Sequence, residues 1–374
     1  MKVGVLGAGL MGSTIAWDLS RSEGVDAVVV ADLDPDRLRE ARRRGGRRVS
    51  TEVVDVTDAR KLASFVKGFD VVSSALPHGV VHQADVALVK AGAKAVNIAF
   101  EDEQMLLDGA ARKSGALLIP GCGLAPGLGG ILLAKGVDAL GGGTSGRILV
   151  GGLPQKPEEP FGYRLVFSIL GLLREFLDEA RIVRNGAEVK VDPVATTIPV
   201  QFPEPVGRCE AFYSDGLATL LYTMKGFDTL EELTVRYPGH VRKMKLLIDA
   251  GLLSKRPIRT GKGDAVPFDV TAAVLAKKLS EGSEEDVTVM RVEVVNRGRA
   301  ATYELVDFYD RKNAVTSMGK TTGYTCSIVT QMVGRGEVRG SGVIPPETAL
   351  RGGLTERLLS ELERKGVSVS QRSS

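Results

Sequence analysis

A glycine-rich run near the start of the chain has the spacing of a phosphate-binding turn. Gly7, Gly9 and Gly12 follow a short apolar run and open a helix pattern, so the backbone can turn tightly and approach a pyrophosphate at the helix N-terminus. Asp32 ends the next apolar run, 20 residues beyond Gly12, where a carboxylate can accept from both ribose hydroxyls. This acid would repel a 2′-phosphate, which favours NAD, whereas the nearby Arg37 is the feature that would favour NADP. The expected cofactor contacts here are Gly7, Gly9, Leu10, Met11, Gly12 and Asp32.

Three later segments should lie at the same edge, because the carboxyl ends of parallel strands meet at one edge of a sheet. Asp55 and Val56 end the third predicted strand and are placed to border the adenine. The fourth strand ends in Ala75, Leu76 and Pro77, and the sixth leads into a glycine-rich loop that can approach a flat ring or serve as a domain-crossing turn. The loop residues assigned to the cofactor are Cys122, Gly123, Leu124, Ala125 and Pro126. His78 and His82 have a zinc-chelating spacing but no further clustered ligand, so no metal is expected.

A second group of chemically capable residues lies in the middle of the chain. Arg236 and His240 precede and open a helix pattern, where the positive end of the helix dipole favours a neutral imidazole. We therefore expect His240 to act as a base and Arg236 to bind a substrate carboxylate. Glu210 and Asp215 are two carboxylates that could hold a cationic amine, or could belong to a surface turn. A buried core histidine is the alternative for His240.

The elements predict an α/β protein, a Rossmann-type doubly wound parallel sheet with an inserted α+β domain, to which the family resemblance given below assigns substrate binding and dimerisation. The predicted parallel strands are 2–6, 27–31, 51–56, 70–76, 93–98 and 116–119. The inserted domain is expected to have a largely antiparallel sheet with strands 147–151, 287–296 and 301–309 and helices 166–177 and 241–251. Helices at 126–140, 321–333 and 354–366 complete the pattern. The expected division is 1–125 for the dinucleotide domain, 126–318 for the insertion and 319–374 for helices that return to the first domain.

Composition narrows the range of partners. The 374 residues include 49 basic and 46 acidic side chains, a net charge of +3, which gives no general affinity for nucleic acid. The seven arginines of 37–48 fit a solvated helix face. No apolar run approaches the length of a membrane span, and three scattered cysteines suit a reducing compartment, so we expect a cytoplasmic protein with a small-molecule partner.

Several of these segments together resemble the saccharopine dehydrogenase-like superfamily over nearly the whole length, and within it the L-lysine 6-dehydrogenase type. The motifs that carry the resemblance are GAGLMG at 7–12, PGCGLAPGL at 120–128, VGGLPQKPEEP at 150–160, RIVRNGAEVKVDP at 181–193, EAFYSDGL at 210–217, RYPGHVRKMKLL at 236–247 and GVIPPE at 342–347.

The resemblance implies NAD-dependent oxidative deamination of L-lysine at the ε-carbon, release of ammonia, and a homodimer. It places Asn97 and Thr322 near the substrate. Relatives often carry an aspartate where this chain has Asn97, and the following run 100–103 is unusually acidic. Two alternatives stay open: a dehydrogenase that acts on a secondary amine, of the saccharopine or carboxynorspermidine type, and a non-catalytic NAD-binding protein.

Overall fold

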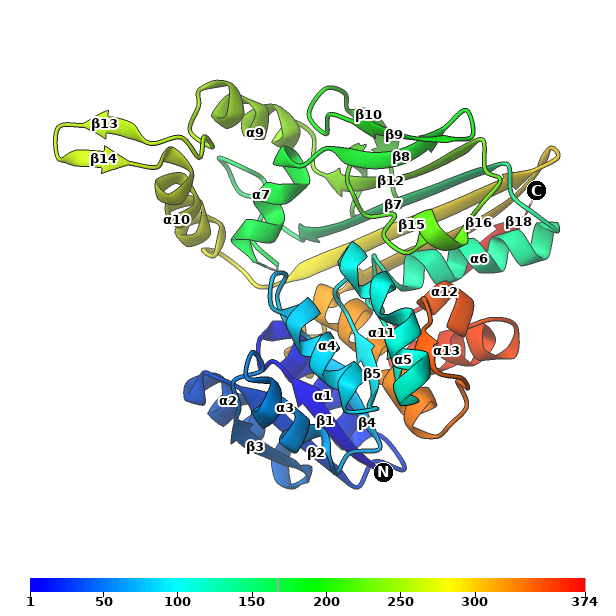
Figure 1. Ribbon diagram of the computed structural model, residues 1–374. Helices are drawn as coiled ribbons and strands as arrows, with labels where there is room; N and C mark the ends of the chain where they lie inside the picture. The colour runs from blue at the N-terminus through cyan, green and yellow to red at the C-terminus, as the bar shows by residue number, and fades with distance from the viewer. Residues whose placement is uncertain (167, 374) are drawn as a thin grey trace. The chain divides into compact units, whose positions relative to one another are not determined.

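The computed structural model describes residues 1–166 and 168–373, which form two compact units (Figure 1). Unit 1 comprises Met1–Gly142, Leu217–Lys225 and Gly319–Val369. Unit 2 comprises Gly143–Gly216, Gly226–Met318 and the C-terminal residues from Ser370. The predicted helix 166–177 begins later, as Ile169–Leu177 (α7), and its predicted second residue, Phe167, lies outside the described residues.

Unit 1 is built on a seven-stranded sheet whose strands all run parallel, in the order β17-β6-β5-β4-β1-β2-β3. The strands are β1 (Lys2–Leu6), β2 (Ala27–Asp32), β3 (Val49–Val53), β4 (Val71–Ser74), β5 (Lys94–Asn97), β6 (Leu117–Ile119) and β17 (Gly342–Val343). The α-helices are α1 (Leu10–Arg21), α2 (Pro35–Gly45), α3 (Ala59–Val66), α4 (Val81–Lys90), α5 (Asp108–Ser114), α6 (Leu128–Leu140), α8 (Leu220–Thr223), α11 (Ser317–Gly334), α12 (Pro346–Ala349) and α13 (Gly353–Arg364), with 3₁₀ turns η1 (Gly46–Arg48) and η2 (Asp102–Leu107).

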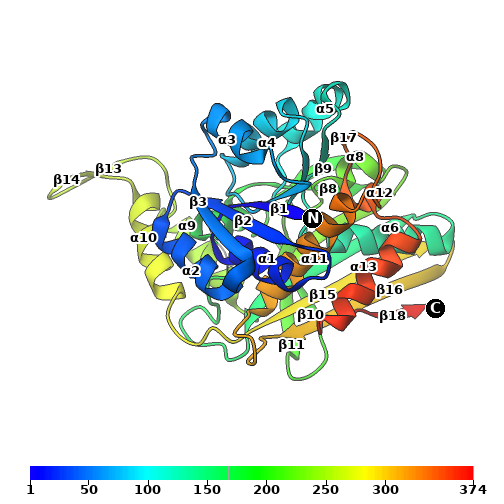
Figure 2. The ribbon, with the colours of Figure 1, turned by 90° about the horizontal axis from the view of Figure 1, so that it is seen from below.

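Helices cover both faces of this sheet. Figure 2 shows α3, α4 and α5 on one face and α1, α2 and α11 on the other. The helices α3 and α4 bury residues such as Leu62, Val81 and Leu88 against the strands. The strands have nearly continuous apolar sequences because neither face of the sheet meets water. The predicted doubly wound parallel sheet is confirmed.

Unit 2 carries a nine-stranded mixed sheet in the order β10-β11-β12-β7-β15-β16-β18, with β8 and β9 extending from β12. The strands are β7 (Ser145–Pro154), β8 (Ala180–Arg184), β9 (Ala187–Val191), β10 (Ile198–Gln201), β11 (Arg208–Tyr213), β12 (Thr229–Arg236), β15 (Asp286–Asn296), β16 (Arg299–Phe308) and β18 (Ser370–Ser373). Helices α7, α9 (His240–Asp249) and α10 (Pro267–Leu279) and a hairpin of β13 (Ile258–Thr260) and β14 (Gly263–Ala265) complete the unit. β12 pairs with β7 in parallel and the other neighbours are antiparallel, which fits the expected α+β class.

The units differ from the expected division in three segments. Helix α6 belongs to unit 1, where Leu128, Ile131 and Leu132 are fully buried. The segment Leu217–Lys225 also belongs to unit 1, although it lies within the predicted insertion. The end of the chain joins unit 2, because β18 pairs with β16. These differences arise from contacts between segments far apart in sequence, which no local pattern specifies.

Candidate active site

The glycine-rich turn between β1 and α1 has the geometry of a dinucleotide cradle. Gly7 has φ +92°, and a Cβ there would lie 2.7 Å from the Ala75 carbonyl oxygen. A Cβ at Gly12 would overlap the Gly7 carbonyl oxygen. At Gly9, by contrast, an added Cβ would meet no atom within 4 Å, and φ is −68°. The fold itself requires Gly7 and Gly12, whereas the open space at Gly9 is what a ligand that approaches the backbone needs.

Asp32 lies directly beside this turn. Its Oδ2 accepts from the Ala8 backbone N–H at 2.6 Å and its Oδ1 accepts from the Asp34 N–H at 2.9 Å. Each carboxylate oxygen has a second lone pair, so both can still accept from ribose hydroxyls. Leu10 and Met11 occupy the first turn of α1, whose leading N–H groups have no partner inside the helix. The expected diphosphate and ribose contacts are therefore brought together.

The third strand places its predicted adenine contacts differently. β3 ends at Val53 rather than at Val56, because Asp55 forms a turn in which its Oδ1 accepts from the N–H and hydroxyl of Thr57. These bonds lower the pKa of Asp55, with the hydroxyl bond contributing most. Val56 is buried in the core of unit 1. Val56 thus contributes to the packing of unit 1.

The loops after β4 and β6 flank the same edge. The Ala75 N–H donates to the Leu6 carbonyl, Leu76 is buried and Pro77 is exposed. In the glycine-rich loop Cys122 and Leu124 are buried, while Ala125 and Pro126 are half-buried. Burial raises the pKa of the Cys122 thiol well above its usual value, so it stays neutral. The methyl group of Thr322, near the start of α11, packs 3.0 Å from where a Cβ of Gly123 would be.

Asn97, expected to bind substrate, is fully buried at the end of β5. Its Nδ2 donates to Asp85 at 3.0 Å and its Oδ1 accepts from the Ala99 N–H at 2.8 Å. Both polar atoms of the amide are thus engaged within unit 1. The structure reassigns Asn97 from substrate contact to holding the loop that follows β5.

That loop carries an acidic and aromatic rim, which we define as His78, Phe100, Glu101, Asp102 and Tyr222. The Tyr222 hydroxyl donates to Asp102 Oδ1 at 2.8 Å, and its ring stands edge-on to Phe100 at 6.3 Å between centroids. Glu101 Oε1 accepts from the Gly79 N–H at 2.6 Å and lies 3.5 Å from His78 Nδ1. The acidic run 100–103 is apparent in the sequence. Tyr222, which completes the rim, lies in α8, more than a hundred residues further along the chain, so no local pattern connects it with the run.

Glu347 of the GVIPPE motif fixes α8 beside this rim. Its carboxylate is fully buried and accepts from the hydroxyl groups of Thr219 at 3.0 Å and Thr223 at 2.5 Å. Burial raises the pKa of Glu347, which the two hydroxyl bonds oppose. The motif was visible in the sequence, but its role was not, because the three residues meet only in the folded chain.

Arg236 does not present a free guanidinium for a substrate carboxylate. The side chain is 2% exposed, donates to Glu175 Oε2 at 2.5 Å, and lies 4.6 Å from the centroid of the Tyr163 ring. Its charge is therefore already compensated inside unit 2. The structure reassigns Arg236 to the interior.

His240 is likewise a core histidine. It is 1% exposed, packs among Phe161, Tyr163 and Phe176, and its Nδ1 lies 2.9 Å from the Phe161 carbonyl oxygen. That carbonyl requires Nδ1 to carry the proton. Burial, followed by the charge of Arg236, lowers the pKa of His240 to about 3. The expectation of a neutral imidazole holds, but desolvation is the cause, and the buried ring is withdrawn from solvent.

The two carboxylates of the 210–217 motif also have structural partners. Glu210 Oε1 accepts from the Val241 N–H at 2.9 Å in the first turn of α9. Asp215 accepts from the Arg181 backbone N–H at 3.0 Å and from its guanidinium at 2.9 Å, which fixes the start of β8. These side chains therefore have structural roles within unit 2, whereas the dinucleotide turn and the rim lie in unit 1.

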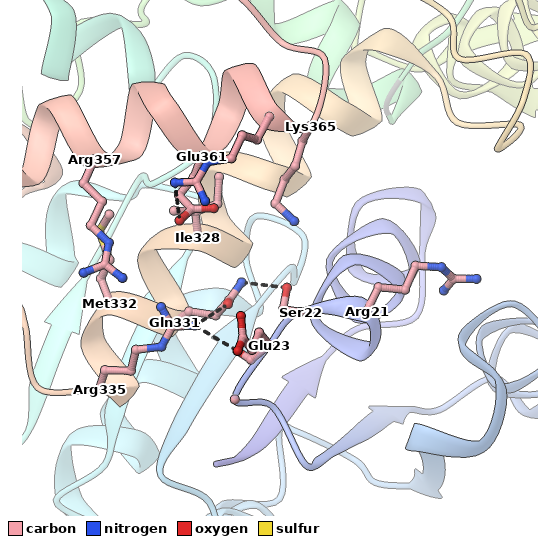
Figure 3. A pocket seen from close by; sticks show the side chains of 12 residues that line it. Arg21, Ser22, Glu23, Ile328, Gln331, Met332, Arg335, Arg357, Glu361 and Lys365 are labelled. Atoms are coloured by element: carbon pink, nitrogen blue, oxygen red, sulfur yellow. Dashed lines mark hydrogen bonds and ion pairs between the residues drawn. The ribbon is translucent and has the colours of Figure 1, made fainter.

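A hollow of about 820 Å³ lies on the side of unit 1 away from the carboxyl ends of its strands (Figure 3). Helices α1, α11 and α13 end around it, and Arg21, Arg335, Arg357, Arg364 and Lys365 line it. Basic residues complement the negative ends of helix dipoles, and several are paired: Arg357 with Glu337 at 2.7 Å, Arg364 with Glu361 at 3.0 Å and Lys365 with Asp18 at 2.6 Å. The hollow is remote from the carboxyl ends of the strands and is not the dinucleotide site.

Within 1–166 and 168–373, no three His, Cys, Asp or Glu side chains gather as metal ligands would. No helix in this part of the chain has the length and apolar character needed to cross a membrane.

Two models of known protein families match this chain. Residues 3–119 match the family model described as the saccharopine dehydrogenase NADP binding domain, and residues 123–367 match the saccharopine dehydrogenase C-terminal domain. The chain belongs to the saccharopine dehydrogenase family. The resemblance read from the motifs is confirmed at this level, and the family is one of oxidoreductases.

Individual relatives in the saccharopine dehydrogenase family agree with this assignment. The NADP⁺, L-glutamate-forming saccharopine dehydrogenase of Schizosaccharomyces pombe is 24% identical over 398 residues, 85% of this chain and 87% of the relative. The Saccharomyces cerevisiae enzyme of the same description is 22% identical over 445 residues, 98% of each chain. The apo structure of saccharopine dehydrogenase (L-Glu forming) from Saccharomyces cerevisiae is similar with a TM-score of 0.82 at 20% identity, covering 100% of this chain and 99% of that one. This last likeness confirms the fold.

Proposed function

We propose that this chain is an NAD-dependent dehydrogenase that oxidises the carbon bearing an amine in an amino acid, with the ε-carbon of L-lysine as the preferred position. The observation that carries the proposal is the acidic and aromatic rim beside the dinucleotide cradle in unit 1. Lysine at neutral pH carries two ammonium groups and one carboxylate, so its net charge is positive. An acidic rim complements that charge. The rings of Phe100 and Tyr222 add faces suited to a cation.

The cradle supports NAD as the coenzyme. The free space at Gly9 and the position of Asp32 beside Ala8 suit a diphosphate and an unphosphorylated ribose. A 2′-phosphate would lie against the carboxylates of Asp32 and Asp34. The yeast relatives are described with NADP⁺, so Asp32 is the residue on which the choice of NAD rests.

The reaction balances as R–CH₂–NH₃⁺ + NAD⁺ + H₂O giving R–CHO + NH₄⁺ + NADH + H⁺. When bound, the coenzyme would supply a hydride acceptor next to the amine-bearing carbon. The task of this chain is to hold that carbon at about 3 to 3.5 Å from the acceptor and to take up a proton. For lysine, 2-aminoadipate 6-semialdehyde is the product.

The amine must lose a proton before oxidation. With a reference pKa of about 10.4, this costs about 4.6 kcal/mol at pH 7. Because His240 is buried, we assign the role of base to His78, an exposed imidazole 3.5 Å from Glu101. Carboxylates of the rim favour the bound ammonium and do not help to deprotonate it, so we expect activity to rise toward alkaline pH.

A second candidate is cleavage of a secondary amine, as the descriptions of the relatives suggest for those proteins. Such a substrate carries additional carboxylates, which require cationic partners. Arg236, the best sequence candidate, is already paired with Glu175. L-Lysine has a single carboxylate to be matched, so the pairing of Arg236 weighs less against the primary amine than against a substrate with several carboxylates.

One screen tests the proposal. Purified protein is incubated with NAD⁺ or NADP⁺ and a panel of L-lysine, ornithine, cadaverine and saccharopine, and absorbance at the reduced-coenzyme band is followed from pH 7 to 10. We expect reduction with L-lysine and NAD⁺, increasing with pH. Turnover of saccharopine alone would establish the second candidate, and coenzyme binding without turnover would show a non-catalytic protein.

A further inference from the structure

Asp85 is a buried carboxylate in a helix face that is otherwise apolar. It lies on α4 among Val81, Ala84 and Leu88 and is fully buried. Burial is the main cause that raises its pKa to about 7, while two amide bonds act in the other direction. An apolar side chain would fill this position at lower cost, so the acid must serve a purpose other than packing.

Two amide side chains donate to this carboxylate. They are Asn97 Nδ2, at 3.0 Å from Asp85 Oδ2, and Gln104 Nε2. Their orientations are set independently, because the Asn97 amide oxygen accepts from the Ala99 N–H at 2.8 Å and the Gln104 amide oxygen accepts from the Glu101 N–H at 2.7 Å. Neither amide can be reversed without losing a backbone bond, so both must present N–H groups to Asp85.

The bonds continue from these amides into three loops at the cofactor edge. Through Gln104 the carboxylate fixes Glu101, whose Oε1 accepts from Gly79 N–H in the loop after β4. Through Asn97 it fixes the loop after β5, and the Asn97 carbonyl accepts from the Cys122 N–H at 2.7 Å in the loop after β6. One buried acid is thereby connected to all three loops that border the rim.

The geometry points to Asp85 as a positioning residue of the amine-oxidising site: its carboxylate holds the loops after β4, β5 and β6 in one arrangement by accepting from Asn97 and Gln104. The inference rests on the proposed function for its link to turnover, and on hydrogen bonds alone for the link to loop order. Asp85 touches neither amine nor coenzyme in this scheme and acts through Glu101 and His78.

The first test replaces the carboxylate with an amide of the same shape. In Asp85→Asn one of the two donors faces an NH₂ group. We expect kcat/KM for the amine to fall by about tenfold to a hundredfold, as a misplacement of about 1 Å does. The Kd for ADP-ribose, the part of the coenzyme that the glycine turn and Asp32 would hold, should change by less than about threefold because these residues lie outside the network. Hydrogen exchange should accelerate at the N–H groups of Gly79, Ala99 and Glu101.

Asp18→Asn is the matched control. Asp18 is also buried in unit 1, but it accepts from Ser327 and Lys365, away from the three loops.

The second test moves the acid to the other end of its hydrogen bond. In the double variant Asp85→Asn with Asn97→Asp, the new amide at position 85 donates to the new carboxylate at 97 and still accepts from Gln104, and the Ala99 N–H keeps its acceptor. Every donor again has an acceptor, so we expect the double variant to regain activity to within about threefold of wild type, a coupling that two independent sites would not show. Slow exchange at the three loops should return as well.

Three outcomes would overturn the inference. They are a folded Asp85→Asn protein with wild-type turnover and exchange, a control Asp18→Asn that accelerates exchange at the same loops, and a double variant that fails to recover. If Asp85→Asn does not fold, the double variant alone decides, because it must fold and work. If the wild-type protein oxidises no amine, the proposed function fails, while the exchange measurements still decide whether Asp85 orders the three loops.

Discussion

Gly9 offers the sharpest test of the dinucleotide cradle, because the protein itself does not need a glycine there. Its φ of −68° is open to any residue, and an added Cβ meets nothing within 4 Å. At the N-cap of α1, Gly→Ala costs about 0.5 to 1 kcal/mol of helix stability. The smaller conformational entropy of the unfolded chain returns about 0.4 to 1 kcal/mol. We therefore expect Gly9→Ala to fold with a Tm within about 2 °C of wild type.

Coenzyme affinity should respond very differently. The Cβ would occupy the space through which a diphosphate reaches the N–H groups at the start of α1. Loss of one charge-assisted hydrogen bond costs about 1.5 to 3 kcal/mol, or roughly tenfold to 150-fold in Kd. Titration calorimetry with NAD⁺ and NADH, alongside thermal unfolding without ligand, measures both effects on one preparation.

Gly12→Ala is the control, because its Cβ would overlap the Gly7 carbonyl oxygen. It should lower stability by about 1 to 3 kcal/mol even without ligand. A Gly9→Ala protein with unchanged coenzyme Kd would refute the placement of the diphosphate at this turn. A Gly9→Ala protein that unfolds as readily as Gly12→Ala would refute the claim that the space at Gly9 is free.

Two further predictions concern the interior of unit 2. Arg236→Met should destabilise the protein by about 1 to 3 kcal/mol, because it removes the partner of the half-buried Glu175, and the folded fraction should keep its KM for amine; a raised KM at unchanged Tm would return Arg236 to the substrate. Glu232, whose pKa is raised by burial from 4.5 to about 8, binds its proton more tightly when folded, so its contribution to stability is fully present below pH 4.5 and is lost as pH rises to 8. Glu232→Gln should remove roughly 3 to 4 kcal/mol of the difference in unfolding free energy between pH 5 and pH 8, measured by urea unfolding. An equal pH dependence in the two proteins would contradict this.

The site residues divide into those that local spacing could identify and those it could not. The GAGLMG turn and Asp32 lie between and after the elements that the spacing predicts, because a strand, a tight turn and a helix fix their geometry within about thirty residues. Arg236 and His240 are buried with partners inside unit 2, which no local pattern indicated, because a sequence shows that a residue can do chemistry without showing whether it is buried. Glu175, which neutralises Arg236, lies 61 residues away.

The sequence by itself determined the alternation of strands and helices, the parallel sheet and the dinucleotide turn, since these depend on period, glycine conformation and short spacing. Only the tertiary structure decided which carboxylates meet which partners. Asp85 joins Asn97 and Gln104, and Glu347 joins Thr219 and Thr223, through contacts between segments that are distant along the chain. The physical reason is that burial and hydrogen-bond partnership, which set the charge and reach of a side chain, arise only when those segments pack together.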